Sequence, residues 1–505
     1  MTNHTLSILR PTTFWRIAVL VAILVCGFTT RLYDLTDPPL DYASTRQLRS
    51  AIIARGIYYG ASNDVPEWEK EVAQKEKDRQ EQLEPAIFET LVGYLYLITG
   101  QEVVWFARIL SSFFWTLGGL ALFGLSRELS SYDGAVISLI YYLFGPFSLL
   151  ASRTFQPDPL MTAAIIWTWY SFFQWSKARS GKWAWITGLI AGAAILIKST
   201  AIFFMFFGMA AVVFTEYKFR DLRKDYQIWL IAALSALPTI IYFIYGYFIS
   251  GIITDQFKGR LFNPELWGQL SFYKEWLGTT SDVLGHLVIF LVALVGLILV
   301  REKRFRRFLI GSWIGFTIFG FAVSYYVTTH SYYLLPAIPL AAITLGAVAD
   351  WIFTWMRKAK MTGLAWSGII AILISGVALG YYIYHRDDYR HEPGYYSKVA
   401  SYVSPSDKII ALSQDYGFRL AYYGWINAQP WSRLDNQVQP GQKTNEERQF
   451  SSRFSSIVDG YDFFIITRME EFRKQTELNN QLNDHYPVLV EGGGYMIYDL
   501  RERLD

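Results

Sequence analysis

The sequence predicts a polytopic α-helical membrane protein with a smaller, more polar α/β domain at its C-terminal end. The mean hydropathy of the 505-residue chain is positive, +0.20, and 17% of its residues are aromatic. Apolar runs recur as far as residue 385, and most approach the ~20 residues that a helix needs to cross a bilayer. Beyond that point polar residues dominate, and strand-like runs alternate with a helix-like stretch.

Apolar segments of this kind predict about eleven membrane-spanning helices. They cover residues 14–33, 104–126, 134–152, 159–176, 183–197, 199–215, 227–250, 283–300, 308–327, 335–355 and 363–384. Arg10 and Arg16 accompany the first segment, as in a signal peptide, but the run is long and no small-residue cleavage site follows it. We therefore expect a retained signal-anchor helix.

Basic loops set the orientation of these helices. The loops are KARSGK (177–182), KFRDLRK (218–224), REKRFRR (301–307) and MRKAK (356–360). If Lys198-Ser199-Thr200 separates two helices, all four loops fall on the side of the N-terminus, whereas a single long helix would place the last three opposite the first. The positive-inside tendency favours two helices, a cytoplasmic N-terminus, and everything after residue 385 outside the cytoplasmic membrane.

Two large parts are then expected on the outer face. The first is the loop 34–103, in which the charged stretch 67–82 is typical of a solvated helix. Its apolar stretch 86–99 is too short to span comfortably and suits a helix at the membrane interface. We assign this loop to a transmembrane domain of residues 1–385 and treat residues 386–505 as a separate α/β domain.

The C-terminal domain is expected to contain strands at 408–412 and 461–467, a helix at 469–483 and two further strands within 486–500. Gly492-Gly493-Gly494 lies between the last two strands. Because a phosphate-binding loop needs a following helix, a hairpin turn is the better interpretation of these glycines.

Composition excludes several function classes. A net charge of +3 leaves no electrostatic footprint for nucleic acid. The single cysteine, Cys26, provides neither a disulfide framework nor a thiolate metal site. We see no internal repeat and no paired broken helices of the transporter kind. We expect a monomer whose partners are membrane lipids and its substrates.

Ionisable residues near membrane depth are costly, at about 2.5–3.5 kcal/mol each on insertion scales, and therefore mark candidate sites. Those expected at the outer ends of the helices are Asp41, Arg46 and Arg49 in PPLDYASTRQLRS, Arg153 and Asp158 in SRTFQPDPL, Lys198, and His330 with Tyr332 and Tyr333 in THSYYLLPAIP. In a compact bundle they are predicted to converge on one outer cavity.

Each candidate also has a purely structural alternative. Asp158, before a proline, can be the N-cap of the fourth helix, and Asp41 can cap a helix that starts at Ala43. Lys198 and Arg153 can extend towards lipid headgroups. His330 can be a hydrogen-bonded histidine at the interface.

The residue types favour one chemistry. A carboxylate can act as general base on an acceptor hydroxyl, and nearby cations can neutralise a phosphate leaving group. Sugar transfer from a polyprenyl phosphate meets both demands.

The order of these features resembles the GT-C class of membrane glycosyltransferases, particularly the group of bacterial aminoarabinose (lipid A) transferases and protein O-mannosyltransferases. The resemblance lies in RLYDLTDPPLDYASTRQ, PAIFETLVGYLYLITG, WFARILSSFFWTLGGLALFGLSREL, ASRTFQPDPLMTAA, GLIAGAAILIKSTAIF and HSYYLLPAIPLAAI. It implies the GT-C fold and covers most of the membrane part.

The resemblance also implies roles for individual residues. The catalytic acid of the first outer loop corresponds to Asp41, and the acid between helices three and four to Asp158. The basic residue that ends helix five corresponds to Lys198, and the histidine-tyrosine motif to His330 and Tyr333.

The sequence departs from the family pattern at three positions. Tyr42 stands where a second acid is usual, so we expect no cofactor and no divalent metal, although a metal is possible. The spacing between Asp41 and Arg46 differs from that in the lipid A transferases. We nevertheless expect Arg46, like Arg153, to contact the phosphate of the donor. Glu84 precedes Pro85 where a lysine is frequent, and places a third acid near the donor.

The implied function is transfer of a single sugar from a polyprenyl-phosphate donor to a lipid, glycan or protein acceptor, with inversion, at the outer face of the cytoplasmic membrane. The alternatives are glycan transfer of the oligosaccharyltransferase type, a transporter, and a receptor or assembly module. The sequence does not specify the sugar or the acceptor.

Overall fold

A computed structural model describes residues 13–80, 84–251, 261–432 and 446–504. Its internal contacts divide the chain into two units. The helical unit comprises Met1–Leu35, Glu81–Phe88 and Trp105–Asp387, and the α/β unit comprises Thr36–Gln80, Glu89–Val104 and Asp388–Asp505. Arg10 and the last two residues of the predicted charged helix 67–82 lie outside the described residues.

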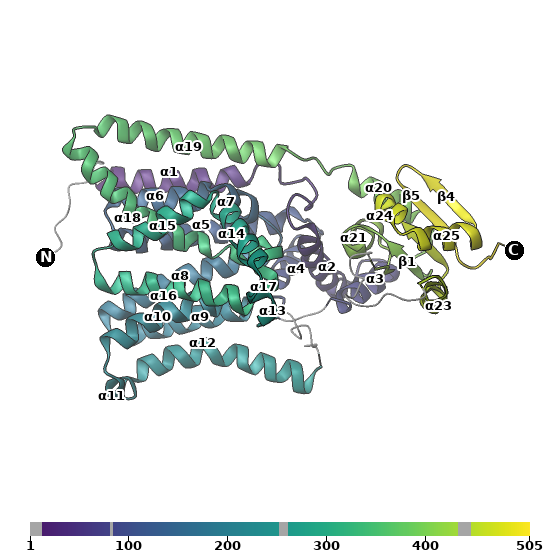
Figure 1. Ribbon diagram of the computed structural model, residues 1–505, viewed down its shortest axis with the longest axis horizontal. Coiled ribbons are helices and arrows are strands. Elements are labelled where there is room, and N and C mark those ends of the chain that lie inside the picture. The colour runs from purple at the N-terminus through teal and green to yellow at the C-terminus, as the bar shows by residue number, and fades with distance from the viewer. Residues whose placement is uncertain (1–12, 81–83, 252–260, 433–445, 505) are drawn as a thin grey trace. The chain divides into compact units, whose positions relative to one another are not determined.

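The helical unit consists of long helices, most of which run roughly parallel (Figure 1), and of short ones. They are α1 (Thr13–Arg31), α5 (Trp105–Leu129), α6 (Tyr132–Phe144), α7 (Pro146–Ala151), α8 (Asp158–Ala178), α9 (Gly181–Ile197), α10 (Ala201–Glu216), α11 (Phe219–Leu222), α12 (Tyr226–Ile244), α13 (Pro264–Trp267), α14 (Leu270–Leu284), α15 (Leu287–Leu299), α16 (Lys303–Ala322), α17 (Ser324–Thr329), α18 (Ala337–Lys358) and α19 (Thr362–His385). A π-helical turn, Tyr245–Ile249, extends α12, and a 3₁₀ turn, Ser331–Leu334, precedes α18.

Each predicted apolar segment contains a helix, and the predicted separation at Lys198-Ser199-Thr200 is confirmed by the gap between α9 and α10. The segment 134–152, predicted as one helix, is broken into α6 and α7. Gly145 there adopts an extended backbone, with φ −60° and ψ 146°, directly before Pro146. A residue that precedes proline is pushed out of the helical region, which explains the break.

Helix α14 is not predicted by the sequence pattern, because its residues are only moderately apolar. It ends at Gly285, whose φ of +91° is a left-handed conformation that favours glycine. Helices α14 and α15 meet there at an 84° bend, so the pair forms either a broken span or a re-entrant loop.

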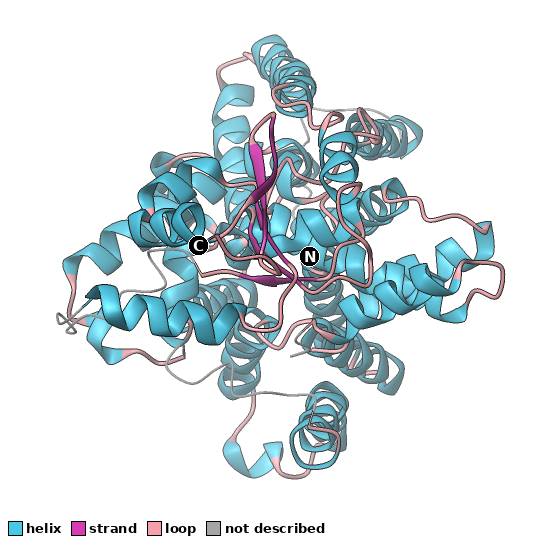
Figure 2. Ribbon diagram, turned by 90° about the vertical axis from the view of Figure 1, so that its right-hand side faces the viewer, coloured by secondary structure: helices cyan, strands magenta, loops and turns pink. Residues whose placement is uncertain are grey.

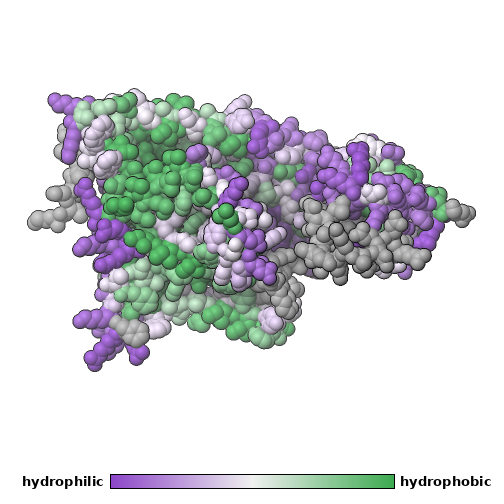
Figure 3. Space-filling view, in the orientation of Figure 1, coloured by the Kyte–Doolittle hydropathy of each residue, from purple (hydrophilic) through white to green (hydrophobic). Residues whose placement is uncertain are grey.

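Within the described residues, five helices are long and apolar enough to cross a membrane, or six if the bent pair α14–α15 counts as one span. The predicted number of about eleven is therefore not confirmed. Several of the other helices are shorter than a full span, such as α6 and α9. Figure 3 shows hydrophobic side chains over most of the visible face of this unit and hydrophilic ones at the end where α11 lies.

Glycines let neighbouring helices approach closely. A Cβ atom on Gly311 or Gly315 of α16 would lie 2.4 Å from Phe207 O or 2.1 Å from Phe203 O of α10. Such distances exclude any side chain at these two positions. This close contact is the packing mode expected where helices associate without a hydrophobic driving force.

The α/β unit combines segments of the first loop with the C-terminal part of the chain. Its elements are α2 (Ser44–Ala61), α3 (Glu67–Asp78), most of α4 (Ile87–Thr99), α20 (Glu392–Ala400), β1 (Ile409–Leu412), α21 (Phe418–Gly424), β2 (Ala428–Pro430), α23 (Glu446–Val458), β3 (Phe463–Ile466), α24 (Met469–Lys474), α25 (Thr476–His485), β4 (Val488–Gly492) and β5 (Tyr495–Asp499). A 3₁₀ turn, Gln414–Gly417, follows β1.

The strands form one mixed sheet of order β2-β1-β3-β5-β4, shown in magenta in Figure 2. Strand β1 pairs in parallel with β2 and β3, whereas β5 pairs antiparallel with β3 and β4. Ile409 and Ala411 face α20 and α21, while Ile410 and Leu412 face α23, α24 and α25. The predicted strands and the glycine hairpin are confirmed, but the edge strand β2 was not predicted because it is short and ends in Pro430.

The first loop contributes to this unit through a buried ion pair. Arg55 Nε lies 3.0 Å from the carboxylate of Glu102, and Arg55 Nη1 donates to Tyr422 O at 2.6 Å. The guanidinium also stacks on the rings of Tyr422 and Trp425. Burial lowers the pKa of Arg55, but Glu102 together with Tyr422 and Tyr59 outweighs burial, so that the pKa is raised. The sequence assigned this loop to the transmembrane domain, whereas the contacts group it with the C-terminal segment.

Replacement of Arg55 by alanine is expected to destabilise the α/β unit by about 3–5 kcal/mol, because Glu102 would remain buried without its partner. Thermal unfolding of the purified full-length protein measures the loss. The matched control is Arg386→Ala, which breaks an exposed pair with Asp387 and is expected to cost less than about 1 kcal/mol. Equal shifts in the melting temperature of the two variants would contradict the conclusion that the buried Arg55–Glu102 pair stabilises the α/β unit.

Candidate functional site

The break between α9 and α10 holds a buried ion pair. Lys198 adopts an extended backbone that ends α9, and its Nζ lies 2.7 Å from Asp158 Oδ1 at the start of α8. Lys198 is only 4% exposed and Asp158 only 1%. Because both charges are removed from water, each requires the other.

Aromatic rings cover the lysine. Lys198 Nζ lies 3.9 Å from the ring centroid of Tyr333 and 5.0 Å from that of Tyr332, both on the turn before α18. These are cation–π distances. His330 continues the cluster, with its ring centroid 6.3 Å from that of Tyr333 and its Nδ1 2.6 Å from Thr329 Oγ1.

Glu84 contacts the same break through Ser199. Its Oε1 accepts hydrogen bonds from the backbone N–H and the hydroxyl of Ser199, at 3.2 and 3.0 Å. Ser199 follows Lys198 directly, so the structure brings this third acid next to the Asp158–Lys198 pair. The carboxylate of Glu84 fixes the chain at a point where two helices end and backbone donors need partners.

Among the described residues, several buried polar atoms at the start of α8 have no hydrogen-bond partner. They are both side-chain polar atoms of Gln156, Asp158 Oδ2 and Thr162 Oγ1. Asp158 and Thr162 are one turn apart on the same face of the helix. Since buried polar groups normally have partners, such a set is where polar groups of a ligand can bind.

Two of the structural alternatives are wrong for this pair. Asp158 is the first residue of α8, and Pro157 precedes it as a cap without any side-chain hydrogen bond. Asp158 is therefore not the N-cap, and its carboxylate binds Lys198 instead. Lys198 does not extend towards lipid headgroups, because its ammonium is buried against that carboxylate.

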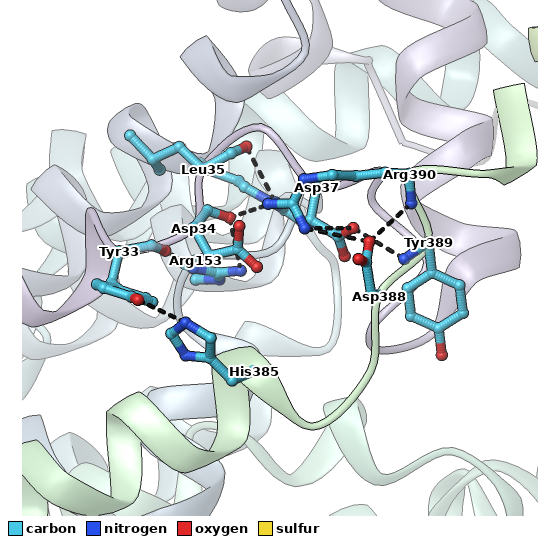
Figure 4. A network of polar contacts seen from close by, with 10 residues as sticks. Tyr33, Asp34, Leu35, Asp37, Arg153, His385, Asp388, Tyr389 and Arg390 are labelled. Atoms are coloured by element: carbon cyan, nitrogen blue, oxygen red, sulfur yellow. Dashed lines mark hydrogen bonds and ion pairs between the residues drawn. The ribbon is translucent and has the colours of Figure 1, made fainter.

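Arg153 is also buried and contacts the segment that follows α1. Its guanidinium donates to Tyr33 O at 2.5 Å and to Asp34 O at 3.4 Å (Figure 4). It also stacks on the Tyr384 ring. Arg108 donates to Asp34 O and Leu35 O at 3.2 and 3.0 Å. Both arginines therefore hold the backbone of residues 33–35. Because the Arg153 guanidinium is buried in these contacts, its predicted alternative, extension towards lipid headgroups, is wrong as well.

In the α/β unit, Asp41 lies just before α2. Its Oδ1 accepts from Tyr42 N at 3.1 Å and from Gln47 Nε2 at 3.0 Å. Gln47 is fully buried and also donates to Tyr42 O at 2.7 Å. A buried glutamine on the first turns of the helix therefore fixes the orientation of the candidate carboxylate.

Asp41 does not cap α2. The residue before the helix is Ala43, in a left-handed conformation with φ 46°, and it has no capping side chain. Arg46 is the third residue of α2 and is half-buried. Upstream, Asp37 Oδ1 accepts from Tyr389 N at 2.9 Å, and Arg390 lies between Asp37 and Asp388 (Figure 4).

The structure thus brings Asp158, Lys198, Tyr333 and Glu84 together, with His330 beside them. Asp41 and Arg46 belong to the other unit, and convergence of the two sets on one cavity stays a prediction. Sequence reasoning missed Gln47 and Ser199. Gln47 could have been found from one signal, because it is an uncharged polar residue only six positions after a candidate acid. The contact of Ser199 with Glu84 joins residues far apart in the chain, so no signal in the sequence indicates it.

Replacement of Lys198 by methionine is expected to destabilise the protein by about 3–5 kcal/mol, because Asp158 would keep an uncompensated buried charge. Adding Asp158→Leu should recover most of that loss by removing the charge. Melting temperatures of the purified single and double variants measure both effects. A double variant as unstable as Lys198→Met would show that the pair is not the reason for the loss.

Residues 84–245 match the family described as dolichyl-phosphate-mannose-protein mannosyltransferase. Among curated proteins, none matches the sequence.

Solved structures are similar over almost the whole chain. ArnT from Cupriavidus metallidurans bound to undecaprenyl phosphate is 16% identical with a TM-score of 0.60, over 97% of this chain and 98% of that one. The apo form of the same protein is 14% identical with a TM-score of 0.54, over 96% of this chain and 98% of that one. The Archaeoglobus fulgidus oligosaccharyltransferase tethered with an acceptor peptide is 13% identical with a TM-score of 0.53, over 96% of this chain and 74% of that one. The chain therefore has the GT-C fold of membrane glycosyltransferases, as the resemblance in its sequence implied.

Proposed function

We propose that this protein transfers a single sugar from a polyprenyl-phosphate donor to an acceptor at the outer face of the cytoplasmic membrane. The observation that carries the proposal is the end-to-end likeness to ArnT, whose structure was determined with undecaprenyl phosphate bound. The donor is then a polyprenyl-phosphate sugar, and the acceptor is a lipid, glycan or protein hydroxyl or amine.

The proposed reaction is one in-line displacement. The acceptor atom attacks the anomeric carbon, the bond from that carbon to the phosphate oxygen breaks, and polyprenyl phosphate leaves with its electron pair. Asp41 takes the proton of the acceptor. Attack from the face opposite the leaving group inverts the anomeric configuration.

The surroundings of Asp41 support its role as base. A general base must present its carboxylate in one orientation towards the acceptor. Tyr42 N and Gln47 Nε2 both donate to Oδ1, which holds the carboxylate in a defined rotamer. We assign the acceptor proton to the carboxylate held in this orientation.

The Asp158–Lys198 pair supports a binding role for the donor. An ammonium has several N–H donors, and Asp158 accepts from one of them. We assign the others to a phosphate oxygen, with Tyr333 covering the lysine and His330 beside it. The unpartnered atoms of Gln156, Asp158 and Thr162 would meet polar groups of the same substrate.

The other candidate residues take different roles. Arg46, in the first turn of α2, is assigned to the donor phosphate. Glu84 organises the Lys198–Ser199 break through Ser199. Arg153 is assigned to holding residues 33–34 rather than to the phosphate, because it donates to their carbonyls.

Glycan transfer of the oligosaccharyltransferase type is the second candidate, favoured by the likeness to the archaeal enzyme. That likeness covers 74% of the archaeal chain, whereas the likeness to ArnT covers 98%, which supports the single-sugar proposal. A transporter would move a sugar across vesicle membranes without releasing polyprenyl phosphate, and an uptake assay distinguishes it.

Asp41→Asn is expected to lower the transfer rate by at least about a hundredfold while the melting temperature and donor binding change little, because asparagine keeps the acceptor oxygen for Gln47 but is not a base. Turnover and donor titration of the purified protein measure these effects. Asp64→Asn, an exposed acid in the same loop, is the control. Full activity of Asp41→Asn would exclude Asp41 as the base.

Removal of divalent metal by EDTA is expected to leave transfer within about twofold, because Tyr42 replaces the second acid. Among the described residues, no three His, Cys, Asp or Glu side chains group as a metal site. Initial rates with EDTA, and after addition of Mg²⁺ or Mn²⁺, provide the measurement. A rate that is abolished by EDTA and restored by metal would favour the oligosaccharyltransferase alternative.

A further inference from the structure

The sheet of the α/β unit has a topological switch point between β1 and β3, which is where sheets of this kind usually bind ligands. In open α/β sheets, ligands bind outside the carboxyl ends of adjacent parallel strands whose following connections pass to opposite faces. Strands β1 and β3 meet this condition. Leu420 of α21, which follows β1, packs on the face of Ile409, whereas Phe472 of α24, which follows β3, packs on the face of Phe464.

The residues at these two strand ends are tightly bonded to one another. Gln414, two residues after β1, donates through Nε2 to Thr467 O at 3.0 Å. Its Oε1 accepts from Thr467 Oγ1 at 2.5 Å and from Tyr396 Oη at 2.8 Å. Thr467 directly follows β3. These hydrogen bonds make the ends of β1 and β3 a rigid support for the next residue, Asp415.

Asp415 projects from this support in an unusual backbone conformation. Asp415, Tyr416 and Gly417 are all left-handed, with φ values of 50°, 58° and 89°. Strained residues of this kind persist where the surrounding structure fixes them, and often mark functional sites. Asp415 Oδ2 accepts from Arg419 Nε at 2.6 Å, and Arg419 also pairs with Glu392 at 2.9 Å.

The other carboxylate oxygen of Asp415 binds the start of α2. Oδ1 accepts from Ser44 Oγ at 2.7 Å and from Thr45 Oγ1 at 2.8 Å. The side chain of Asp415 is only 12% exposed, so both bonds are shielded from water. At the switch point, where such sheets ordinarily bind ligands, Asp415 thus holds the beginning of a helix from the first loop.

The same helical turn holds Asp41. Ser44 and Thr45 begin α2, and Gln47, two residues later, donates to Asp41 Oδ1. The contacts therefore run from the sheet through Asp415 to Ser44 and Thr45, and through Gln47 to Asp41. We propose that Asp415 is a positioning residue that fixes the Asp41 carboxylate through the first turn of α2, which makes the C-terminal sheet part of the catalytic apparatus. The inference rests on the proposed function of Asp41.

The test uses the full-length protein and three changes to this contact. Asp415→Ala and the double variant Ser44→Ala/Thr45→Val remove the contact from either side, whereas Asp415→Asn keeps an acceptor oxygen and tolerates the left-handed backbone. Asp499→Asn is the matched control, because the Asp499 side chain pairs with Arg501 on the same sheet. The measurements are kcat, donor KM, melting temperature and amide hydrogen exchange at residues 43–48.

Removal of the contact between Asp415 and α2 from either side is expected to lower kcat about 10- to 100-fold and to change donor KM less than twofold. The reason is that a small displacement of a base slows the reaction more than it weakens binding. A variant that combines Asp415→Ala with Ser44→Ala/Thr45→Val should lose no more kcat than either change alone, because both changes remove the same interaction. Asp415→Asn should recover most of kcat. Exchange at residues 43–48 should rise in the Ala variant and stay unchanged in Asp499→Asn.

An unchanged kcat in a folded Asp415→Ala protein would overturn the inference, as would losses that multiply in the combined variant. Failure of the proposed function looks different, because the unmodified protein would then transfer no sugar. Hydrogen exchange would still decide whether Asp415 holds α2: no rise at residues 43–48 in Asp415→Ala, or an equal rise in Asp499→Asn, would refute it.

Discussion

The pairing of buried charges is the constraint on which the rest of this structure depends. A charged side chain taken out of water costs several kcal/mol unless an opposite charge or several hydrogen bonds compensate it. Lys198 is buried with Asp158, Arg55 with Glu102, and Arg153 against the carbonyls of Tyr33 and Asp34. Each pairing joins segments that are far apart in the sequence, so each fixes how helices or loops meet.

In the helical unit this constraint also determines what chemistry is available. The charge of Lys198 is balanced by Asp158, so the pair as a whole is neutral and stable in an apolar surrounding. A phosphate that approaches the ammonium would compete with the carboxylate for the same cation. The pair can therefore hold its geometry without substrate and still present N–H donors to an anion, as a leaving-group site requires.

The sequence allowed the fold to be predicted further than the site. Apolar segments predicted where helices lie, and the basic loops predicted the break at Lys198-Ser199-Thr200, because both depend on local composition. The predicted count of spanning helices is not confirmed and helix α14 was not predicted, since helices that pack against one another can be short or only moderately apolar. The cap assignments of Asp41 and Asp158 failed for a different reason. Both acids stand close to helix starts, but their partners, Gln47 and Lys198, are determined by tertiary contacts that spacing does not reveal.

The same limit applies to the first loop. Its sequence gives no sign that Arg55 pairs with Glu102 beside Tyr422, or that Ser44 and Thr45 bind Asp415, because each contact needs the folded sheet. With those contacts known, the loop that carries the proposed base and the C-terminal sheet form one structural unit. A C-terminal part that supports the base in this way explains why charged and strained residues gather after β1.

The central claim is that sugar moves in a single inverting displacement from a polyprenyl phosphate. The most direct test is to incubate the purified protein with a polyprenyl-phosphate sugar of known anomeric configuration and an acceptor, and to determine the product configuration by NMR together with the polyprenyl phosphate released. We expect one polyprenyl phosphate for each sugar transferred and an inverted anomeric centre. A product of retained configuration, or consumption of the donor without stoichiometric release of polyprenyl phosphate, would contradict it.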